Sequence, residues 1–524
     1  MMDVISPAAR ASKDAGRHVT FESFGQPAVE IDVDFIVVGS GAGGAAAAVV
    51  LARAGRSVAI VEAGPWRAPE DYPSTAYGAM RDLLTDWGSL VTRAPALWPI
   101  VQASCVGGST VVNSAIVVRT PGDCFDLWSR EHGIDGDALA KRVWAHQDRL
   151  EHELHADVVL PDARGLSNTL AMDAAENLGF KSHYIVRYAR DCEGAGQCLQ
   201  GCRSGRKQST NVNYVPEVLE RGGWVLSCAP VERVVLEGKR AAGVTGRFRD
   251  PRTRREGARF TVRARHGVLL AASATHTPIL LAKSGIKSRA LGTSFCAHPG
   301  TGIFGLYDEP VDQNVGATQG WASTAFRDEP GLKLETLAIP AEMVAGRLPG
   351  GGRQLVERFR EYRHIAMWVA AVRADTRGTV KPGLFGQPVV RYMLDERDMR
   401  KLRAGLATVA KMHFAAGAKA IIPGIFGLPY KLESRSAPHG GGGPARSARV
   451  HRHPLAPLRR LPDARRSRSR RRRRARQGPR GRGPLRGRRL RHPHHPGREP
   501  AAHDHGPRLG VGRRSRSLAG HVSD

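Results

Sequence analysis

The chain has 524 residues, with 79 Lys and Arg against 49 Asp and Glu and a net charge of +30. A chain of this length can bury the cores of two or more domains. It contains no apolar run of about eighteen residues and no apolar segment near its N-terminus, so we expect neither a membrane span nor a signal peptide. Seven scattered cysteines, an odd number, fit a reducing cytoplasm better than a disulfide framework.

The positive charge is concentrated at the C-terminal end. Residues 441–524 hold 25 Arg, no Lys and four acidic residues, a net of +21, which leaves +9 for residues 1–440. This tail contains no Phe, Trp, Tyr, Ile or Met. We predict that it is disordered, because it cannot bury enough apolar surface to offset its ordering entropy. A basic tail that binds nucleic acid is an alternative, but no aromatic side chain is present to stack on bases.

The first regular elements form a βαβ unit. Residues 1–30 read as an irregular lead-in. The segment DVDFIVV at 32–38 ends in an apolar run typical of a buried parallel strand. A glycine-rich turn and an alanine-rich helix ending at Gly55 follow, and SVAIVE at 57–62 is a second apolar strand. The whole spans about thirty residues, the usual size of such a unit.

The rest of the chain alternates between helical and strand-like patterns. Residues 136–154 have helical spacing, and residues 223–272 read as short strands joined by basic turns. Strand-like runs separated by Gly/Pro turns fill residues 301–395, and residues 395–417 form an amphipathic helix. The composition changes sharply near residues 434–443.

A dinucleotide-binding turn lies inside the βαβ unit. Gly39, Gly41 and Gly44 form GxGxxG within VVGSGAGG. In this motif the first glycine permits a tight turn, the second lets the backbone approach a pyrophosphate, and the third lets helix and strand pack closely. Glu62 ends the next strand and can bind a ribose diol. The motif alone leaves FAD and NAD open, and a glycine-rich turn of an unrelated α/β protein is the simpler alternative.

Two further segments select a family. Residues 103–113, ASCVGGSTVVN, hold a Gly-Gly-Ser turn followed by Asn113, and residues 273–286, SATHTPILLAKSGI, hold a Thr-Pro pair followed by Ser-Gly. With the glycine motif and a third segment, residues 228–246, they resemble the glucose-methanol-choline oxidoreductases over roughly residues 30–430. Ser104 and Lys287 depart from that family's pattern.

The resemblance implies FAD as the cofactor. Only glycines let a backbone approach an isoalloxazine ring as closely as the Gly-Gly-Ser turn does in this family. The strand within residues 228–246 resembles the one whose backbone contacts adenine. No His lies in 103–113, so we expect dissociable FAD. The expected FAD contacts are Gly39, Ser40, Gly41, Ala42, Gly43, Gly44, Glu62, Ala63, Gly107, Gly108, Ser109, Asn113 and Val231.

Residues 192–210 and 291–300 resemble the branch of the family that acts on long-chain alcohols. Cys192, Cys198 and Cys202 lie in the first of these segments with the spacing C-x5-C-x3-C. This is not a zinc pattern, and the sequence gives no fourth ligand. Metal or iron–sulfur ligation is one interpretation. We favour a cysteine-bearing loop near the flavin, with no metal, and expect His298 before Pro299 to be structural.

The catalytic end of the family is missing from this reading frame. The resemblance implies a C-terminal His and a second His or Asn, but residues 441–524 contain neither segment. Read one nucleotide later, codons for Pro484 to Gly510 are compatible with LYVADASGIPTILGVNPQLTIMALAS, and those for Ala456 to Ala464 with HLFGGCRM. Both strings fit the family's C-terminus, so we hypothesise a frameshift between about Leu432 and Ala445.

These features predict an α/β protein with an FAD-binding Rossmann-like domain at 31–300 and a substrate domain built on an antiparallel sheet at 301–433. The disordered tail would be 434–524. The resemblance implies oxidation of the CH–OH group of a small-molecule alcohol by hydride transfer to FAD, with little or no turnover by the chain as written. The alternative is an inactive FAD-binding remnant. The sequence names neither the alcohol nor the electron acceptor.

Overall fold

The computed structural model describes residues 17–22 and 28–433. Contacts divide the chain into Met1–Leu461 and Pro462–Asp524, and all described residues belong to the first unit. The predicted disorder of the tail and the proposed frameshift fall outside the described residues, as does most of the lead-in.

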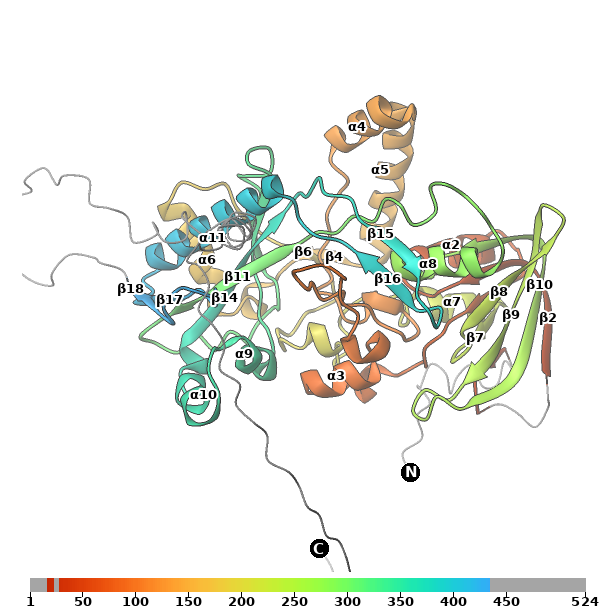
Figure 1. The fold of residues 1–524 in the computed structure, drawn as a ribbon, viewed down its shortest axis with the longest axis horizontal. Helices are drawn as coiled ribbons and strands as arrows, with labels where there is room; N and C mark the ends of the chain where they lie inside the picture. The colour runs from red at the N-terminus through yellow and green to blue at the C-terminus, as the bar shows by residue number, and fades with distance from the viewer. Residues whose placement is uncertain (1–16, 23–27, 434–524) are drawn as a thin grey trace, which may run out of the picture. The chain divides into compact units, whose positions relative to one another are not determined.

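A seven-stranded sheet carries the N-terminal half of the unit (Figure 1). Five neighbouring strands are parallel, and the last two extend the sheet in antiparallel fashion. In spatial order the strands are β1 (His18–Val19), β7 (Trp224–Leu226), β3 (Val58–Val61), β2 (Ala28–Val38), β10 (Glu256–Leu270), β9 (Arg240–Arg249) and β8 (Val231–Glu237).

The βαβ unit predicted from the sequence is confirmed. β2 and β3 flank α2 (Ala42–Arg53) and are parallel neighbours. Ala45, Ala48 and Val49 on α2 are buried in one cluster with Val37 and Ile60 of the strands. The small alanines let the helix pack close to the sheet. The turn between β2 and α2 follows the end of β2 and lies at the carboxyl ends of the parallel strands.

A second seven-stranded sheet is antiparallel throughout, as expected for a substrate domain. Because β5 comes from near residue 183, this sheet draws on both sides of the predicted boundary at residue 300, and that boundary stays a prediction. Its strands in spatial order are β18 (Leu432–Glu433), β17 (Ala420–Ile422), β11 (Gly300–Leu306), β14 (Ile365–Val372), β13 (Leu332–Thr336), β12 (Trp321–Ser323) and β5 (His183–Tyr184).

Helices contribute to two hydrophobic clusters on this sheet. α11 (Glu396–Ala415), predicted at 395–417, and α6 (Leu166–Asn177) share one cluster with β11 and β14. α9 (Ala341–Arg347) belongs to the other cluster, with α10 (Gly352–Phe359) packed against it. The sequence pattern did not indicate these last two helices, because a Pro-Gly-Gly-Gly run separates two segments too short for a helical repeat.

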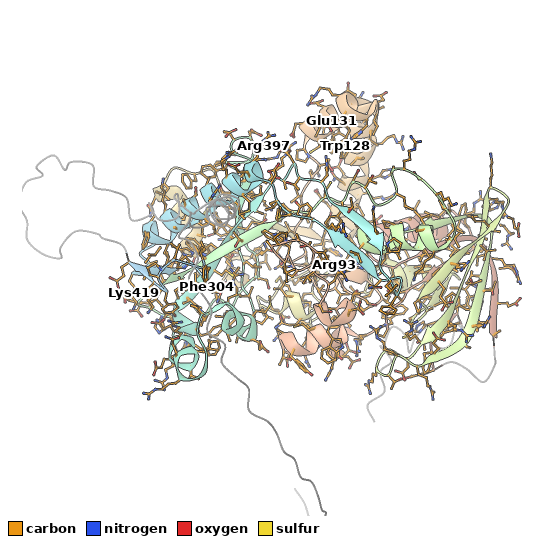
Figure 2. All side chains as sticks on the ribbon, in the orientation of Figure 1. Arg93, Trp128, Glu131, Phe304, Arg397 and Lys419 are labelled. Carbon is orange, nitrogen blue, oxygen red and sulfur yellow. The ribbon has the colours of Figure 1, made fainter. Side chains whose placement is uncertain are left out.

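The remaining helices and strands lie outside the two seven-stranded sheets. Phe125 of α4 (Gly122–His132) packs edge-on against Trp128, which is labelled in Figure 2, and against Trp144 of α5 (Gly136–Glu153). The ring centroids are 5.3 and 5.5 Å apart, and these contacts hold the helix pair together. Within residues 17–22 and 28–433, no helix has the length and apolarity to cross a bilayer. The elements are α3 (Ala76–Asp82), α4 (Gly122–His132), α5 (Gly136–Glu153), α7 (Tyr214–Glu220), α8 (Ser273–Lys283), β4 (Ala156–Val158), β6 (Val186–Tyr188), β15 (Thr379–Pro382) and β16 (Pro388–Arg391).

The turn after β2 provides a test of the fold with a matched control. Gly39 has φ +99°, and a Cβ there would overlap the carbonyl of Ala271, whereas a Cβ on Gly43 would meet nothing within 4 Å. We expect Gly39→Ala to lower the free energy of unfolding by roughly 1–3 kcal/mol from backbone strain alone. Gly43→Ala should leave it unchanged or raise it by up to about 1 kcal/mol. Urea unfolding without FAD measures both, and equal stabilities would contradict the conformation of this turn.

Candidate functional site

The carboxyl ends of three strands meet at the glycine-rich turn. The amide of Gly39 donates to the carbonyl of Val61 (2.9 Å), and the amide of Ala271 donates to the carbonyl of Val38 (2.8 Å). A Cβ on Gly44 would overlap the carbonyl of Gly39. The first and third glycines therefore have the close packing that the motif requires at the edge where α/β sheets bind ligands.

Ser40 joins four segments that are far apart in the sequence. Its fully buried hydroxyl donates to Glu62 Oε2 (2.7 Å) and accepts from the amide of Gly107 (2.9 Å). Its carbonyl accepts from Thr210 Oγ1 (2.8 Å). This Ser40 junction fixes the glycine turn, the end of β3, the Gly-Gly-Ser turn and the segment before α7 relative to one another.

Glu62 is a buried carboxylate held by neutral donors. Oε2 also accepts from the amide of Ser40 (2.9 Å), and Oε1 accepts from the amide of Gly64 (3.0 Å). Burial raises the pKa of Glu62, and these hydrogen bonds oppose the rise. The sequence assigned this carboxylate to a ribose diol. In this structure the Glu62 carboxylate holds the glycine turn in place, and a bound ribose diol would share its oxygens with Ser40.

The Gly-Gly-Ser turn lies directly against the glycine motif. Gly107 and Gly108 have φ of +97° and +51°, and a Cβ on Gly108 would come within 2.9 Å of the Cα of Gly41. Ser109 and Asn113 are exposed beside this contact. Their side chains accept from the backbone amides of Ala103 (3.1 Å) and Ala115 (3.0 Å).

The segment expected to contact adenine approaches from the other side of Glu62. The amide of Ala229 donates to the Glu62 carbonyl (2.8 Å), and that of Cys228 donates to the carbonyl of Gly64 (2.9 Å). Val231 is half-buried at the start of β8, two residues further on. The structure thus brings together all the segments that carry the expected FAD contacts.

The local chemistry fits the diphosphate of FAD. Gly41, the residue before the first turn of α2, offers no capping side chain, and that turn contains no acidic residue. Ala42 and Gly43 are exposed there. Backbone amides and the positive end of the helix dipole are therefore available to phosphate oxygens, and the glycines on both turns allow a close approach of the ligand.

Two buried cations behind the Gly-Gly-Ser turn were not identified from the sequence. Lys207 Nζ donates to the carbonyls of Asn113 (2.9 Å), Cys198 (3.0 Å) and Val111. Arg187 Nε donates to the carbonyl of Ser114 (2.9 Å). Their residues are only 3% and 2% exposed. The segment around residue 207 had been singled out by its resemblance to a family branch, but no pattern in it distinguishes a buried lysine from an exposed one.

A cavity of about 470 Å³ is lined by residues that follow Asn113 in the sequence, the first of which is Ile116. Its walls are largely apolar at Ile116, Val117, Val118, Ile185 and Leu332, with basic side chains at its margin. His298, expected to be structural, is exposed and lines this cavity. The cavity also includes Arg119, Cys124, His183, Thr324, Arg327, Gly331, Lys333, Ala371 and Arg373.

Known proteins have sequences and folds similar to those of this chain. A model of the GMC oxidoreductases matches residues 33–300. An uncharacterized GMC-type oxidoreductase of Mycobacterium tuberculosis is 34% identical over 401 residues, covering 76% of this chain and 62% of its own length. A long-chain-alcohol oxidase of Arabidopsis thaliana is 28% identical over 429 residues, covering 77% of this chain and 55% of its own length.

The fold is also similar to that of solved structures. Formate oxidase of Aspergillus oryzae has a TM-score of 0.54 and 16% identity, over 74% of this chain and 86% of that one. The chain therefore has the fold of that oxidase, while it spans less than two thirds of the length of the mycobacterial and plant relatives.

Lys207 gives a pH-dependent prediction. Burial lowers the pKa of Lys207 to about 8, from an ordinary value of 10.5. Between these values the unfolded chain binds more protons than the folded chain, so the contribution of Lys207 to the free energy of unfolding rises with pH across this window. We expect the stability of the wild type relative to Lys207→Met to increase from below pH 8 to above it.

Urea unfolding of both proteins below, within and above this window measures the difference. Lys419→Met, which removes an exposed lysine labelled in Figure 2, controls for the loss of a lysine in general. A difference between wild type and Lys207→Met that stays flat or falls with pH would contradict the buried position of the ammonium group.

Proposed function

The chain belongs to the GMC oxidoreductase family, and we propose that its FAD site is that of an enzyme that oxidises an alcohol at its CH–OH group. Members of this family are FAD-dependent oxidoreductases. The observation that carries the proposal is the Ser40 junction, which joins the two glycine turns and Glu62 into one site.

Each part of the junction has a binding role. The amides at the start of α2 bind the diphosphate, and Glu62 with Ala63 and Gly64 lies at the ribose end. Val231 lies at the adenine end, and Gly107, Gly108, Ser109 and Asn113 face the flavin ring. When bound, FAD accepts a hydride from the carbon that bears the hydroxyl group. The buried Ser40 and Glu62 hold the turns in place without a preceding rearrangement.

The cavity beyond Asn113 is proposed as the substrate site. Its apolar walls at Ile116, Val117 and Leu332 suit the alkyl part of an alcohol rather than a polar sugar. Burying one methylene contributes about 0.8 kcal/mol, which is roughly a fourfold gain in affinity. A long-chain alcohol is therefore the favoured substrate class. The plant relative is named as a long-chain-alcohol oxidase, which is consistent with this choice.

The proton of the alcohol needs a base that this reading frame does not supply. The family's C-terminal His and Asn correspond to codons compatible with HLFGGCRM and NPQLTIMALA in the frame one nucleotide later. We propose that the protein encoded with that frame restored is the active enzyme. The chain as printed then binds FAD without turnover.

Two genes test this proposal side by side. One encodes the chain as printed, and the other is shifted by one nucleotide between the codons for Leu432 and Ala445. We expect both products to bind FAD, and only the second to reduce an electron-accepting dye when an alcohol is added. Its KM should fall as the alkyl chain of a primary alcohol lengthens, until the cavity is filled.

A gene shifted in the opposite direction controls for the loss of the basic tail. Alcohol-dependent dye reduction by the chain as printed would refute the assignment of the catalytic residues to the other frame. No activity from the restored frame across the alcohol series would refute the proposed reaction.

The mode of FAD attachment follows from the Gly-Gly-Ser segment. Residues 103–113 contain no His, so this segment offers no imidazole for a covalent bond to the flavin. We expect precipitation with trichloroacetic acid to release the FAD into the supernatant, where its absorbance measures the released fraction. Flavin that stays with the precipitated protein would show that another residue forms a covalent link.

A further inference from the structure

Three cysteines gather in one enclosed pocket behind the flavin-facing segment. Cys192, Cys198 and Cys202 line this pocket together with Arg187 and Lys207. The free space among them is about 20 Å³, room for roughly one water molecule. An organic ligand is therefore excluded, and a group of several atoms bonded to the sulfurs requires the cysteine side chains to move apart around it.

The two buried cations of this pocket, Arg187 and Lys207, favour an anionic ligand. Arg187 donates to Cys198 Sγ (2.9 Å) and Cys192 Sγ (3.5 Å), and the amide of Lys207 donates to Cys202 Sγ (3.4 Å). Neither cation forms an ion pair with a carboxylate of the described chain. The carboxylate in the pocket lining, Glu193, is exposed and pairs with Arg206 at 2.8 Å. Two buried positive charges without a counter-charge are costly.

Sulfur ligands of a bound anionic group can supply the counter-charge. The guanidinium of Arg187 and the amide of Lys207 already donate to the three sulfurs. Three cysteine sulfurs beside two buried cations form a site of soft ligands, the type that selects zinc, copper(I) and iron–sulfur clusters.

We infer that Cys192, Cys198 and Cys202 bind an iron–sulfur cluster. A single zinc ion is a poor alternative, since Zn–S bonds of about 2.3 Å bring sulfurs within roughly 4 Å of one another. In residues 17–22 and 28–433, no group of three His, Cys, Asp or Glu side chains is placed to hold one metal ion. A cluster distributes its ligands over several iron atoms.

The binding step is balanced without an oxidant. Ferric and ferrous ions, in the proportion that the cluster holds, and inorganic sulfide supply the cluster, so no electron has to be removed. Each thiol releases one proton to solvent and forms one S–Fe bond, and no cysteine changes its oxidation state. Arg187 and Lys207 then offset the negative charge of the thiolate-bound cluster. The sequence alone favoured a simple cysteine-bearing loop, and the two buried cations are the observation that changes this interpretation.

Lys207 places this pocket next to the proposed flavin site. Its ammonium group binds the carbonyl of Cys198 on one side and those of Val111 and Asn113 on the other. The cluster would thus be a one-electron centre behind the flavin-facing segment, which points to a one-electron acceptor rather than dioxygen. This last consequence rests on the proposed function, whereas the cluster site does not.

The test uses the full chain, produced with added iron and purified without oxygen, before and after incubation with ferric and ferrous iron and sulfide. We expect iron and acid-labile sulfide in comparable amounts, more than one iron per chain, and an electron paramagnetic resonance signal that free flavin cannot give. Cys202→Ser and Cys198→Ser should lose the iron and this signal. Cys296→Ser, which removes an exposed cysteine outside the pocket, should keep both.

Three outcomes would overturn the inference. They are folded protein without iron and sulfide after reconstitution, zinc bound in place of iron, and a disulfide between two of the three cysteines detected by mass after alkylation. The metal content of the wild type decides the matter even where a variant fails to fold. A cluster in a protein that oxidises no alcohol would leave this site standing and reject the proposed function alone.

Discussion

The hydrogen bonds of Ser40 are the constraint on which the rest of the site depends. The hydroxyl bridges Glu62 and Gly107, and the carbonyl accepts from Thr210. These hydrogen bonds are short and buried. A substitution that left any of these polar groups unpaired would therefore cost the desolvation free energy of that group. A residue larger than serine would separate the two glycine turns, and a residue without a hydroxyl group would leave a buried carboxylate with one donor fewer.

Charge is arranged in layers around this junction. The uncapped start of α2 offers a positive end toward the ligand side, while Glu62 puts a buried acid under the turn. Behind the Gly-Gly-Ser turn, Lys207 and Arg187 donate to the backbone carbonyls of Asn113 and Ser114. Carbonyls paired in this way are not free to face a ligand, so the cations would act on the proposed flavin site through the backbone rather than by direct contact.

Local patterns predicted the parts of the structure that local physics controls. The apolar runs of β2 and β3 and the spacing of α11 gave their positions to within a few residues, because burial sets these periods. The glycine motif located the turn, since φ of Gly39 requires glycine. Thr210 and Lys207 were not predicted as site residues, because their roles depend on contacts across 170 and 94 positions of sequence. The short α9 and α10 were missed because each is too brief for a repeat.

The span of the Ser40 junction also bears on how the protein is made. Its bonds connect residues separated by 22, 67 and 170 positions, and the turn packs on Ala271 at the end of β10. Such non-local contacts close large loops and form slowly. On the ribosome the turn has no complete set of partners until β10 has emerged, so more than half of the chain must be synthesised first. The cofactor site therefore forms late in folding, and flavin can bind there only to chains whose first seven-stranded sheet has already formed.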